Sequence, residues 1–250
     1  MIRALLVALT HLVIVPVLGT IALIAHVIRP QWLLAHRFSH FWGRAVMRAA
    51  GVRFRVEGLE TLERCRPAVV VANHSSNFDV YALCSIMPIP YMIPAKQSLF
   101  RIPIVGAAMR SMGMVPLERS GTKRDWAQIE RLARGFERGG LLLFFPEGTR
   151  VEDGRLRPFR KSAFVVAIKH QVPVIPVAII GAHRIQRRRA WRIRPGELVV
   201  RVLEPIPTRG LTYDDRDVLR DRAWQAVRNA LPPDQRPPED GGDTGRRSAR

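Results

Sequence analysis

The chain has 250 residues, 47% of them hydrophobic, and a formal net charge of +19. This length suits one large α/β domain whose core is stable without cross-links. The two cysteines indicate free thiols in a reducing compartment. The excess of positive charge indicates anionic partners or a solvated basic surface. Only 7% of residues are aromatic, and no zinc-finger or RNA-recognition signature is present. The predicted partner is therefore an anionic membrane surface rather than nucleic acid.

The first segment, from Ala4 to Ile28, contains no Asp, Glu, Lys or Arg and lies between Arg3 and Arg29. As one helix of about 37 Å it is long enough to span a bilayer. Pro16 and Gly19 lie in its middle, and a break there would leave halves of about 18 Å, too short to cross. The sequence therefore allows one kinked span, a helical hairpin in one leaflet, or a helix of a soluble core.

A basic amphipathic helix is predicted next, ending near Gly51. Aromatic side chains on its apolar face and arginines along the margin suit the headgroup boundary of a membrane, although a helix packed on the protein's own core gives the same pattern. We predict that residues 1–50 form a membrane-anchoring helical segment. The apolar stripe consists of Leu34, Phe38, Phe41, Trp42, Ala45, Val46 and Ala49, and the margin of Arg37, Arg44 and Arg48.

Strand-like and helix-like runs alternate through residues 51–231, which predicts a mostly parallel central sheet covered by helices. Between the last two strands, the stretch from Arg184 to Arg194 is basic and suits either lipid headgroups or a solvated loop. Residues 232–250 are rich in proline, glycine and charge, and are predicted to be a disordered tail. The predicted strands are residues 52–56, 68–72, 91–94, 114–117, 141–145, 174–180 and 198–203, and the helices are residues 79–86, 104–111, 122–138, 162–169 and 214–231.

Ionisable side chains follow two of these strands directly. The sequence Asn-His-Ser-Ser-Asn-Phe-Asp at residues 73–79 follows the second strand, and Phe-Pro-Glu-Gly-Thr-Arg at residues 145–150 follows the fifth. In open α/β sheets, ligands bind at the edge formed by the carboxyl ends of the strands. The sequence therefore predicts an enzyme site built from these two strand ends.

The first of these stretches pairs a base with a carboxylate. His74 can accept a proton at physiological pH. One helix would separate His74 from Asp79 by about 140°, but a loop entering a helix can pair them. If Ser75, Ser76 or Asn77 caps that helix, Asp79 lies in its first turn and can hold one imidazole nitrogen. The other nitrogen is then free to take a proton from a hydroxyl, as in a catalytic triad without its protein nucleophile.

Two other chemistries fit the sequence less well. A serine nucleophile at Ser75 or Ser76 would need a G-x-S-x-G elbow, which the flanking residues do not form. No second cluster of histidine or cysteine has ligand spacing, so no metal site is predicted.

The second stretch suits binding of a phosphate. Gly148 permits a tight turn, and Arg150 can hold a phosphate with two hydrogen bonds. Glu147 could accept a substrate hydroxyl or fix an arginine. A capped turn with a solvated Glu-Arg pair is the structural alternative.

Together these residues resemble the glycerolipid acyltransferase family, which includes 1-acylglycerol-3-phosphate acyltransferases. Asn73, His74 and Asp79 match the family's N-H-x4-D motif, and residues 145–150 match its F-P-E-G-T-R motif in full. Two more motifs follow the family's order, at residues 115–119 and 174–178. Ser75 and Pro116 depart from the usual residues without touching a position of chemical role.

The resemblance implies transfer of a fatty acyl group from acyl-CoA or acyl carrier protein to the free hydroxyl of a lysophospholipid, 1-acylglycerol-3-phosphate, giving phosphatidic acid. His74 would be the general base and Asp79 would orient it. No acyl-enzyme, metal or organic cofactor is implied. The resemblance also implies that residues 51–231 are the acyltransferase domain. The residues implied to bind the acceptor are Arg119, Glu147, Gly148, Thr149 and Arg150, with Lys96 adding positive charge.

The substrates also predict a location. The acceptor and product reside in a bilayer, whereas the donor is water-soluble, so we expect a cell-membrane protein with its active site on the cytoplasmic side; the basic flank after Arg29 agrees. Three alternatives remain: acylation of another lysolipid such as a lyso-ornithine lipid, a non-catalytic protein that binds anionic membranes, and a serine hydrolase of lipids.

Overall fold

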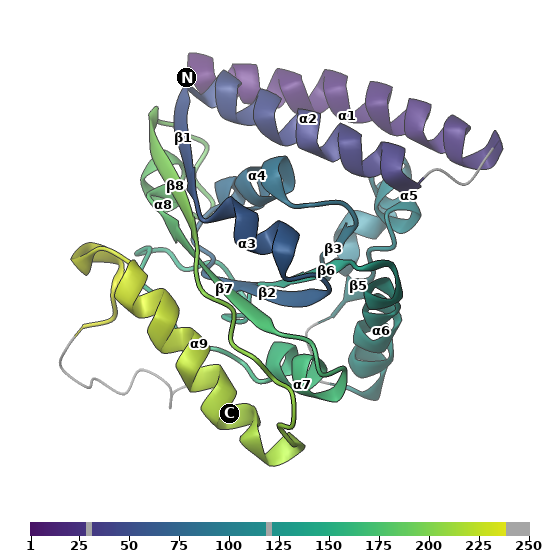
Figure 1. Ribbon diagram of the computed structural model, residues 1–250. Helices are drawn as coiled ribbons and strands as arrows, with labels where there is room; N and C mark the ends of the chain where they lie inside the picture. The colour runs from purple at the N-terminus through teal and green to yellow at the C-terminus, as the bar shows by residue number, and fades with distance from the viewer. Residues whose placement is uncertain (29–31, 119–121, 239–250) are drawn as a thin grey trace.

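The computed structural model describes residues 1–28, 32–118 and 122–238. A six-stranded sheet lies at the centre, and helices pack on both of its faces (Figure 1). The strand order is β1-β8-β7-β2-β6-β3, and all neighbours are parallel except β7 and β8. The predicted α/β class with a mostly parallel sheet is therefore confirmed. The strands are β1 (Val52–Glu57), β2 (Ala68–Ala72), β3 (Tyr91–Met92), β6 (Leu141–Phe144), β7 (Val174–Ile180) and β8 (Gly196–Val202).

The five predicted helices are present, one of them in two parts, and the short helices Leu59–Arg64 and Ala182–Ile185 were not predicted. Residues 122–138 were expected to form one helix, but the α-helix ends at Ala133, and a 3-10 turn continues to Gly139, whose φ of 66° ends it in the left-handed region. The helices are α1 (Ile2–Ile28), α2 (Trp32–Ala50), α3 (Leu59–Arg64), α4 (Asn77–Ile86), α5 (Pro103–Ser111), α6 (Lys123–Ala133), α7 (Ser162–Lys169), α8 (Ala182–Ile185) and α9 (Arg216–Ala230), with 3-10 turns η1 (Gln97–Arg101), η2 (Arg134–Arg138), η3 (Tyr213–Asp215) and η4 (Pro233–Gln235).

The central strand β2 shows how the sheet divides the core. All five of its residues are buried. Val69 and Val71 join a hydrophobic cluster with side chains of α7 and α9, whereas Val70 joins a second cluster with side chains of α2 and α4. Because successive side chains of a strand point to opposite faces, a strand that is apolar on both faces belongs in the middle of a helix-covered sheet.

One predicted strand lies outside the central sheet. Of residues 114–117, only Pro116–Leu117 forms a strand, β5, which pairs in parallel with β4 (Ala95–Lys96) as a separate small sheet. The N–H of Ala95 donates to the carbonyl of Val115 at 3.1 Å. Pro116 has no N–H to offer a central ladder, which favours this edge position.

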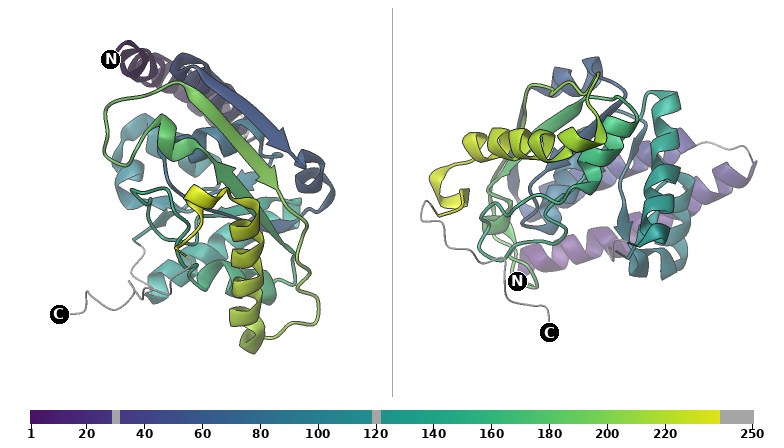
Figure 2. Two further views of the ribbon diagram at one scale, coloured as in Figure 1. Left: turned by 90° about the vertical axis from the view of Figure 1, so that its left-hand side faces the viewer. Right: turned by 90° about the horizontal axis from the view of Figure 1, so that it is seen from below.

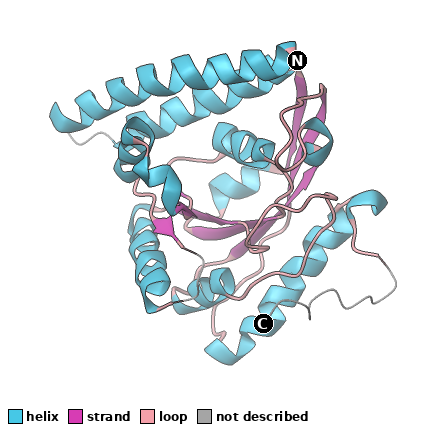
Figure 3. Cartoon of the chain, turned by 180° about the vertical axis from the view of Figure 1, so that it is seen from behind, coloured by secondary structure: helices cyan, strands magenta, loops and turns pink. Residues whose placement is uncertain are grey.

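The helices α1 and α2 lie side by side along one end of the molecule (Figures 1 and 3). α1 is a single helix through Pro16, so the break considered at Pro16 and Gly19 does not occur. A Cβ at Gly19 would lie 2.5 Å from Cγ2 of Ile104, so the missing side chain lets α1 approach α5 closely. Arg3 Nη1 donates to the Ala50 carbonyl at 3.1 Å and joins the start of α1 to the end of α2.

The surface of α1 is mostly apolar and exposed. The window Ile2–Ile21 has a mean hydropathy of 2.3, and 11% of it is buried, so the helix is long and apolar enough to cross a membrane. α2 behaves differently, because Val46, Met47 and Ala50 are buried in the core of the protein while Phe41 stays exposed. The exposed large apolar residues of α1 are Ile2, Leu5, Leu6, Leu9, Leu12, Val13, Val17, Ile21 and Ile24.

The predicted disordered tail is wrong for its first part. Residues 233–235 form η4, and Gln235 is fully buried. The physical reason is that the side-chain amide of Gln235 hydrogen-bonds backbone groups at the end of β7, and its backbone carbonyl accepts an N–H from a neighbouring loop. Composition alone does not reveal these contacts. Residues 239–250 lie outside the described residues.

Leu143, in β6, should be a sensitive position of the core because it is fully buried. We expect Leu143→Ala to lower the free energy of unfolding by about 2–5 kcal/mol, through lost burial and the cavity that remains. Urea unfolding of both proteins measures this difference. Leu99→Ala, at an exposed leucine, is the control, and an equal loss in both variants would contradict the burial of β6 between β2 and β3.

Candidate active site

The junction between β2 and α4 brings His74 and Asp79 together. His74 Nδ1 lies 2.9 Å from Oδ2 of Asp79. The same oxygen accepts the backbone N–H groups of Ser75 at 2.6 Å and Ser76 at 2.8 Å. Ser76 is the N-cap of α4 and accepts the Phe78 N–H at 3.3 Å, which places Asp79 in the first turn. The pairing expected for a loop that enters a helix is therefore present.

The imidazole of His74 is oriented by contacts on its ring and on one nitrogen. Its ring stacks on Phe145 of the second motif, with centroids 4.1 Å apart and planes at 21°. Because Nδ1 donates its proton to Asp79, the neutral ring carries its lone pair on Nε2. Among the described residues, none hydrogen-bonds Nε2, and the side chain keeps a tenth of its surface exposed. This nitrogen can accept a proton from a bound hydroxyl.

Glu147, in the second motif, is buried and contacts the loop that carries His74. Its Oε1 accepts the backbone N–H of His74 at 3.3 Å, while Oε2 is buried without a hydrogen-bond partner among the described residues. Burial raises the pKa of Glu147 well above its ordinary value, and the Asp79 charge adds to the rise, against the lowering effect of the His74 N–H. The structure therefore shows this side chain supporting the backbone of His74, a role that the sequence did not suggest.

The two motif loops are further joined by Arg150 and Val151. Arg150 Nη1 donates to Oδ1 of Asn77 at 2.6 Å, and the Val151 N–H donates to the His74 carbonyl at 3.1 Å. Gly148 turns the chain with a φ of 80°, a left-handed conformation that favours glycine. Thr149, next to these residues, is exposed.

The remaining predicted site residues are less closely tied to His74. Lys96 is exposed, and the register of the small sheet pairs it with Leu117, two residues before Arg119. In the part of the chain that the structure describes, no hydrogen bond or ion pair joins Lys96 to residues 73–79. Arg119 itself lies outside the described residues.

Gln235 is a site-supporting residue that the sequence did not indicate. Its Nε2 donates to the Ile179 carbonyl at 3.2 Å, its Oε1 accepts the Gly181 N–H at 2.8 Å, and its own carbonyl accepts the Leu156 N–H at 2.9 Å. Asn73, next to His74, donates to the same Ile179 carbonyl at 2.9 Å. A single glutamine in a proline-rich segment has no periodicity that could have identified it.

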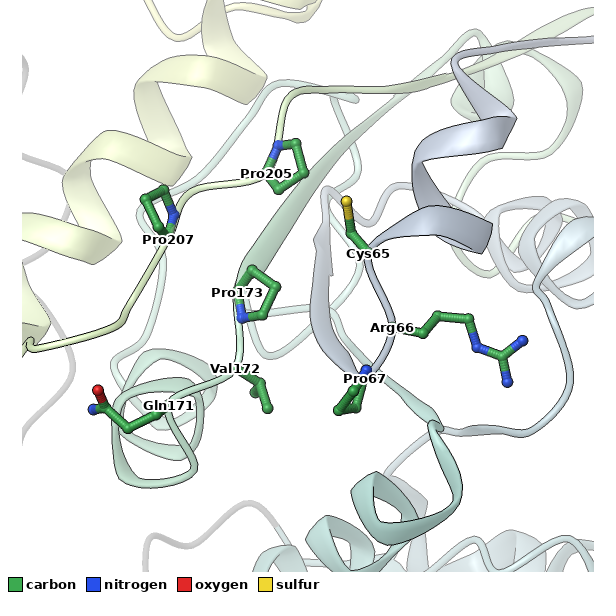
Figure 4. A pocket seen from close by; sticks show the side chains of 8 residues that line it. All are labelled: Cys65, Arg66, Pro67, Gln171, Val172, Pro173, Pro205 and Pro207. Carbon is green, nitrogen blue, oxygen red and sulfur yellow. The ribbon is translucent and has the colours of Figure 1, made fainter.

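The hollow drawn in Figure 4 lies away from His74. Its volume is about 370 Å³, and it is lined by Pro67 and Pro173, which precede β2 and β7, so it lies at the opposite edge of the sheet. Arg66 points away from these prolines and bonds the carbonyls of Gly139 and Ile89. No cluster of three or more His, Cys, Asp or Glu side chains within the described ranges could hold a metal ion.

Comparison with known proteins agrees with this geometry. Residues 53–180 match the family described as Acyltransferase. The chain belongs to the acyltransferase family. It is 32% identical over 195 residues to human 1-acyl-sn-glycerol-3-phosphate acyltransferase beta, a match that covers 78% of this chain and 70% of the human protein. The family resemblance inferred from the motifs is thus confirmed.

Other relatives share parts of the chain or its fold. The chloroplastic 1-acyl-sn-glycerol-3-phosphate acyltransferase BAT2 of Brassica napus is 41% identical over 131 residues, and the match spans 52% of this chain but 38% of that protein. The crystal structure of the 1-acyl-sn-glycerophosphate acyltransferase PlsC from Thermotoga maritima has the same fold. Its TM-score is 0.77 at 24% identity, over 91% of this chain and 94% of that one.

The hydrogen bonds of Gln235 should contribute measurably to stability and to the rate. We expect Gln235→Ala to destabilise the fold by about 1–3 kcal/mol, because it leaves the buried Gly181 N–H unpaired. The acyl-transfer rate should also fall, since Ile179 positions Asn73 beside His74. Thermal unfolding and steady-state rates measure both effects. Asp234→Ala is the control in the same turn, because Asp234 makes only an exposed ion pair with Arg184.

The raised pKa of Glu147 predicts a pH dependence of stability. An acid whose pKa is higher in the folded state binds its proton more tightly there. The protonated group therefore stabilises the fold fully below its ordinary pKa of 4.5, and this stabilisation is lost as pH rises through the pKa of the folded state. Glu147→Gln keeps the shape of the neutral acid and should remove this loss. Unfolding free energies measured across pH should fall less steeply in the variant, and parallel curves would show that Glu147 is charged in the folded protein.

Proposed function

We propose that the protein transfers a fatty acyl group from acyl-CoA or acyl carrier protein to the free hydroxyl of 1-acylglycerol-3-phosphate, giving phosphatidic acid. The observation that carries the proposal is the 2.9 Å contact between His74 and Asp79, which leaves Nε2 for the acceptor. The names of the relatives support the choice of acceptor. His74 and Asp79 are the proposed catalytic residues.

The proposed reaction is a direct displacement. Nε2 of His74 takes the proton of the acceptor hydroxyl as its oxygen attacks the thioester carbonyl. The C–O bond forms, the C–S bond breaks, and the imidazolium returns the proton to the departing thiolate. Asp79 stabilises the positive ring between these events. No metal or organic cofactor takes part in this scheme.

The geometry of the serines favours direct attack over an acyl-enzyme. Ser76 Oγ donates to the Gln186 carbonyl at 2.8 Å and caps α4 with its lone pair. Ser75 Oγ is buried and has no hydrogen-bond partner among the described residues, so it makes no hydrogen bond to His74. Neither hydroxyl is arranged as an activated nucleophile.

The acceptor phosphate is assigned to the second motif. Arg150, held by Asn77, offers further donors to a phosphate, and Gly148 and Thr149 allow its close approach. Arg119 and Lys96 add positive charge in this scheme. Glu147 acts on the substrate indirectly, through the backbone of His74.

We also propose that residues 1–50 anchor the protein on the cell membrane, with the active site on the cytoplasmic side where the acyl donor is found. The exposed apolar face of α1 supports membrane contact. Because α1 packs along the length of α2 and against α5, the geometry favours a helix lying in the interface over one that crosses the bilayer (Figure 1).

His74→Ala should lower the rate of acyl transfer by about 10²–10⁴-fold, the usual effect of removing a general base. Lysophosphatidic acid with labelled acyl-CoA, read by lipid mass spectrometry, measures product formation. His170→Ala, at a histidine that pairs with Glu130 on α6, is the matched control. A folded His74→Ala protein with near-normal turnover would contradict the proposed base, and faster product from a lyso-ornithine lipid would change the assigned acceptor.

A further inference from the structure

The segment between α8 and β8, residues 186–195, contains five arginines and no acidic residue, and we call it the arginine loop. One of the five, Arg188, lies 4.0 Å from Glu152. The other four are exposed, and no carboxylate pairs with them within the described ranges. The four are Arg187, Arg189, Arg192 and Arg194.

The same loop exposes a large apolar side chain. Trp191 has 88% of its surface exposed, more than any other large apolar residue among those described except the terminal Met1. A tryptophan on a soluble surface gains nothing from this exposure. Tryptophan prefers the boundary between membrane and water, where its ring meets acyl chains and its N–H meets headgroups.

Hydrogen bonds and a buried side chain fix the conformation of the arginine loop. The Arg194 N–H donates to the Ile185 carbonyl at 2.9 Å and closes its base, and Ile193 is buried beneath it. Within the loop, Gln186 Nε2 donates to the Ala190 carbonyl at 2.9 Å, and Arg189 has a φ of 63°. The backbone therefore presents the arginines and the tryptophan outward.

The loop lies beside the start of α1. Gly196, which follows it, pairs with Val52 at the start of β1. Gly51 precedes Val52 and packs against the guanidinium of Arg3 on α1. Figures 1 and 2 show the connection between α8 and β8 next to the amino terminus. A bilayer that receives the apolar face of α1 would thus meet the arginine loop as well.

We propose that the arginine loop is a second lipid-contact surface, which binds the phosphates of anionic headgroups while Trp191 enters the interface. The proposal rests on the membrane association proposed for α1. The loop also adjoins the site, because the Gln186 carbonyl accepts the hydroxyl proton of Ser76, the cap of the catalytic helix. An acidic acyl carrier protein would be drawn by the same charges, but an exposed tryptophan fits lipid better.

The test is flotation of the full-length protein with two kinds of vesicle, phosphatidylcholine alone and phosphatidylcholine mixed with phosphatidylglycerol. Each surface arginine strengthens binding to anionic lipid by about fivefold. The loop variant should therefore lose most of the preference for phosphatidylglycerol, and an equal number of substitutions on α6, η2, α9 and a distant loop should not. The loop variant combines Arg187→Gln, Arg189→Gln, Arg192→Gln and Arg194→Gln, and the control combines Arg131→Gln, Arg134→Gln, Arg209→Gln and Arg222→Gln.

Binding to phosphatidylcholine alone reports α1 and should be equal in all three proteins. Quenching of tryptophan fluorescence by lipids brominated near the headgroup should fall in Trp191→Phe. An unchanged preference for phosphatidylglycerol in the loop variant, or unchanged quenching in Trp191→Phe, would overturn the proposal. So would a loop variant that binds anionic vesicles normally but has a raised KM for acyl carrier protein alone.

The assay needs no turnover, so it separates this proposal from the proposed reaction. A protein that prefers anionic vesicles yet does not acylate lysophosphatidic acid would contradict the reaction and support the loop. A protein that floats with neither vesicle would contradict both the anchor and the loop.

Discussion

Oδ2 of Asp79 accepts the N–H groups of Ser75 and Ser76 and the Nδ1 proton of His74, and the geometry of the candidate site depends on this oxygen. The same carboxylate caps α4 and orients the imidazole, so the start of the helix and the direction of the ring are set together. The five-residue spacing follows from this double use. Within it, the chain must leave β2, turn, and complete the first turn of α4.

The second motif holds the histidine from the other side. Glu147 accepts the His74 N–H, the Val151 N–H donates to the His74 carbonyl, and Phe145 stacks on the ring. The two nearby carboxyl groups have different surroundings, since Asp79 receives three donors whereas burial raises the pKa of Glu147. Because burial disfavours the charged form of Glu147, Asp79 is the carboxylate that can act as counter-ion to an imidazolium, a division of roles that suits the proposed general base.

The sequence predicted what local pattern determines. The apolar runs at β2, β6 and β7 are buried on both faces, so composition alone identifies them, and the residues that end them identify the site. Tertiary contacts decided the rest. Pro16 does not break α1, Pro116 leads its strand out of the central sheet, and Gln235 is buried in a segment whose composition suggests disorder. Each outcome depends on a partner far away in the chain.

The sizes of the expected binding energies give different roles to the two proposed membrane contacts, α1 and the arginine loop. α1 exposes nine large apolar side chains between Ile2 and Ile24, and full burial of each contributes about 1.5–3 kcal/mol. The four arginines of the loop contribute about 1 kcal/mol each, only at an anionic surface, and salt screens them. α1 therefore supplies affinity for any bilayer, whereas the arginine loop makes the protein prefer anionic bilayers over neutral ones. Because the Gln186 carbonyl of the loop accepts the hydroxyl proton of Ser76, the cap of α4, that selection would act beside the proposed acceptor site.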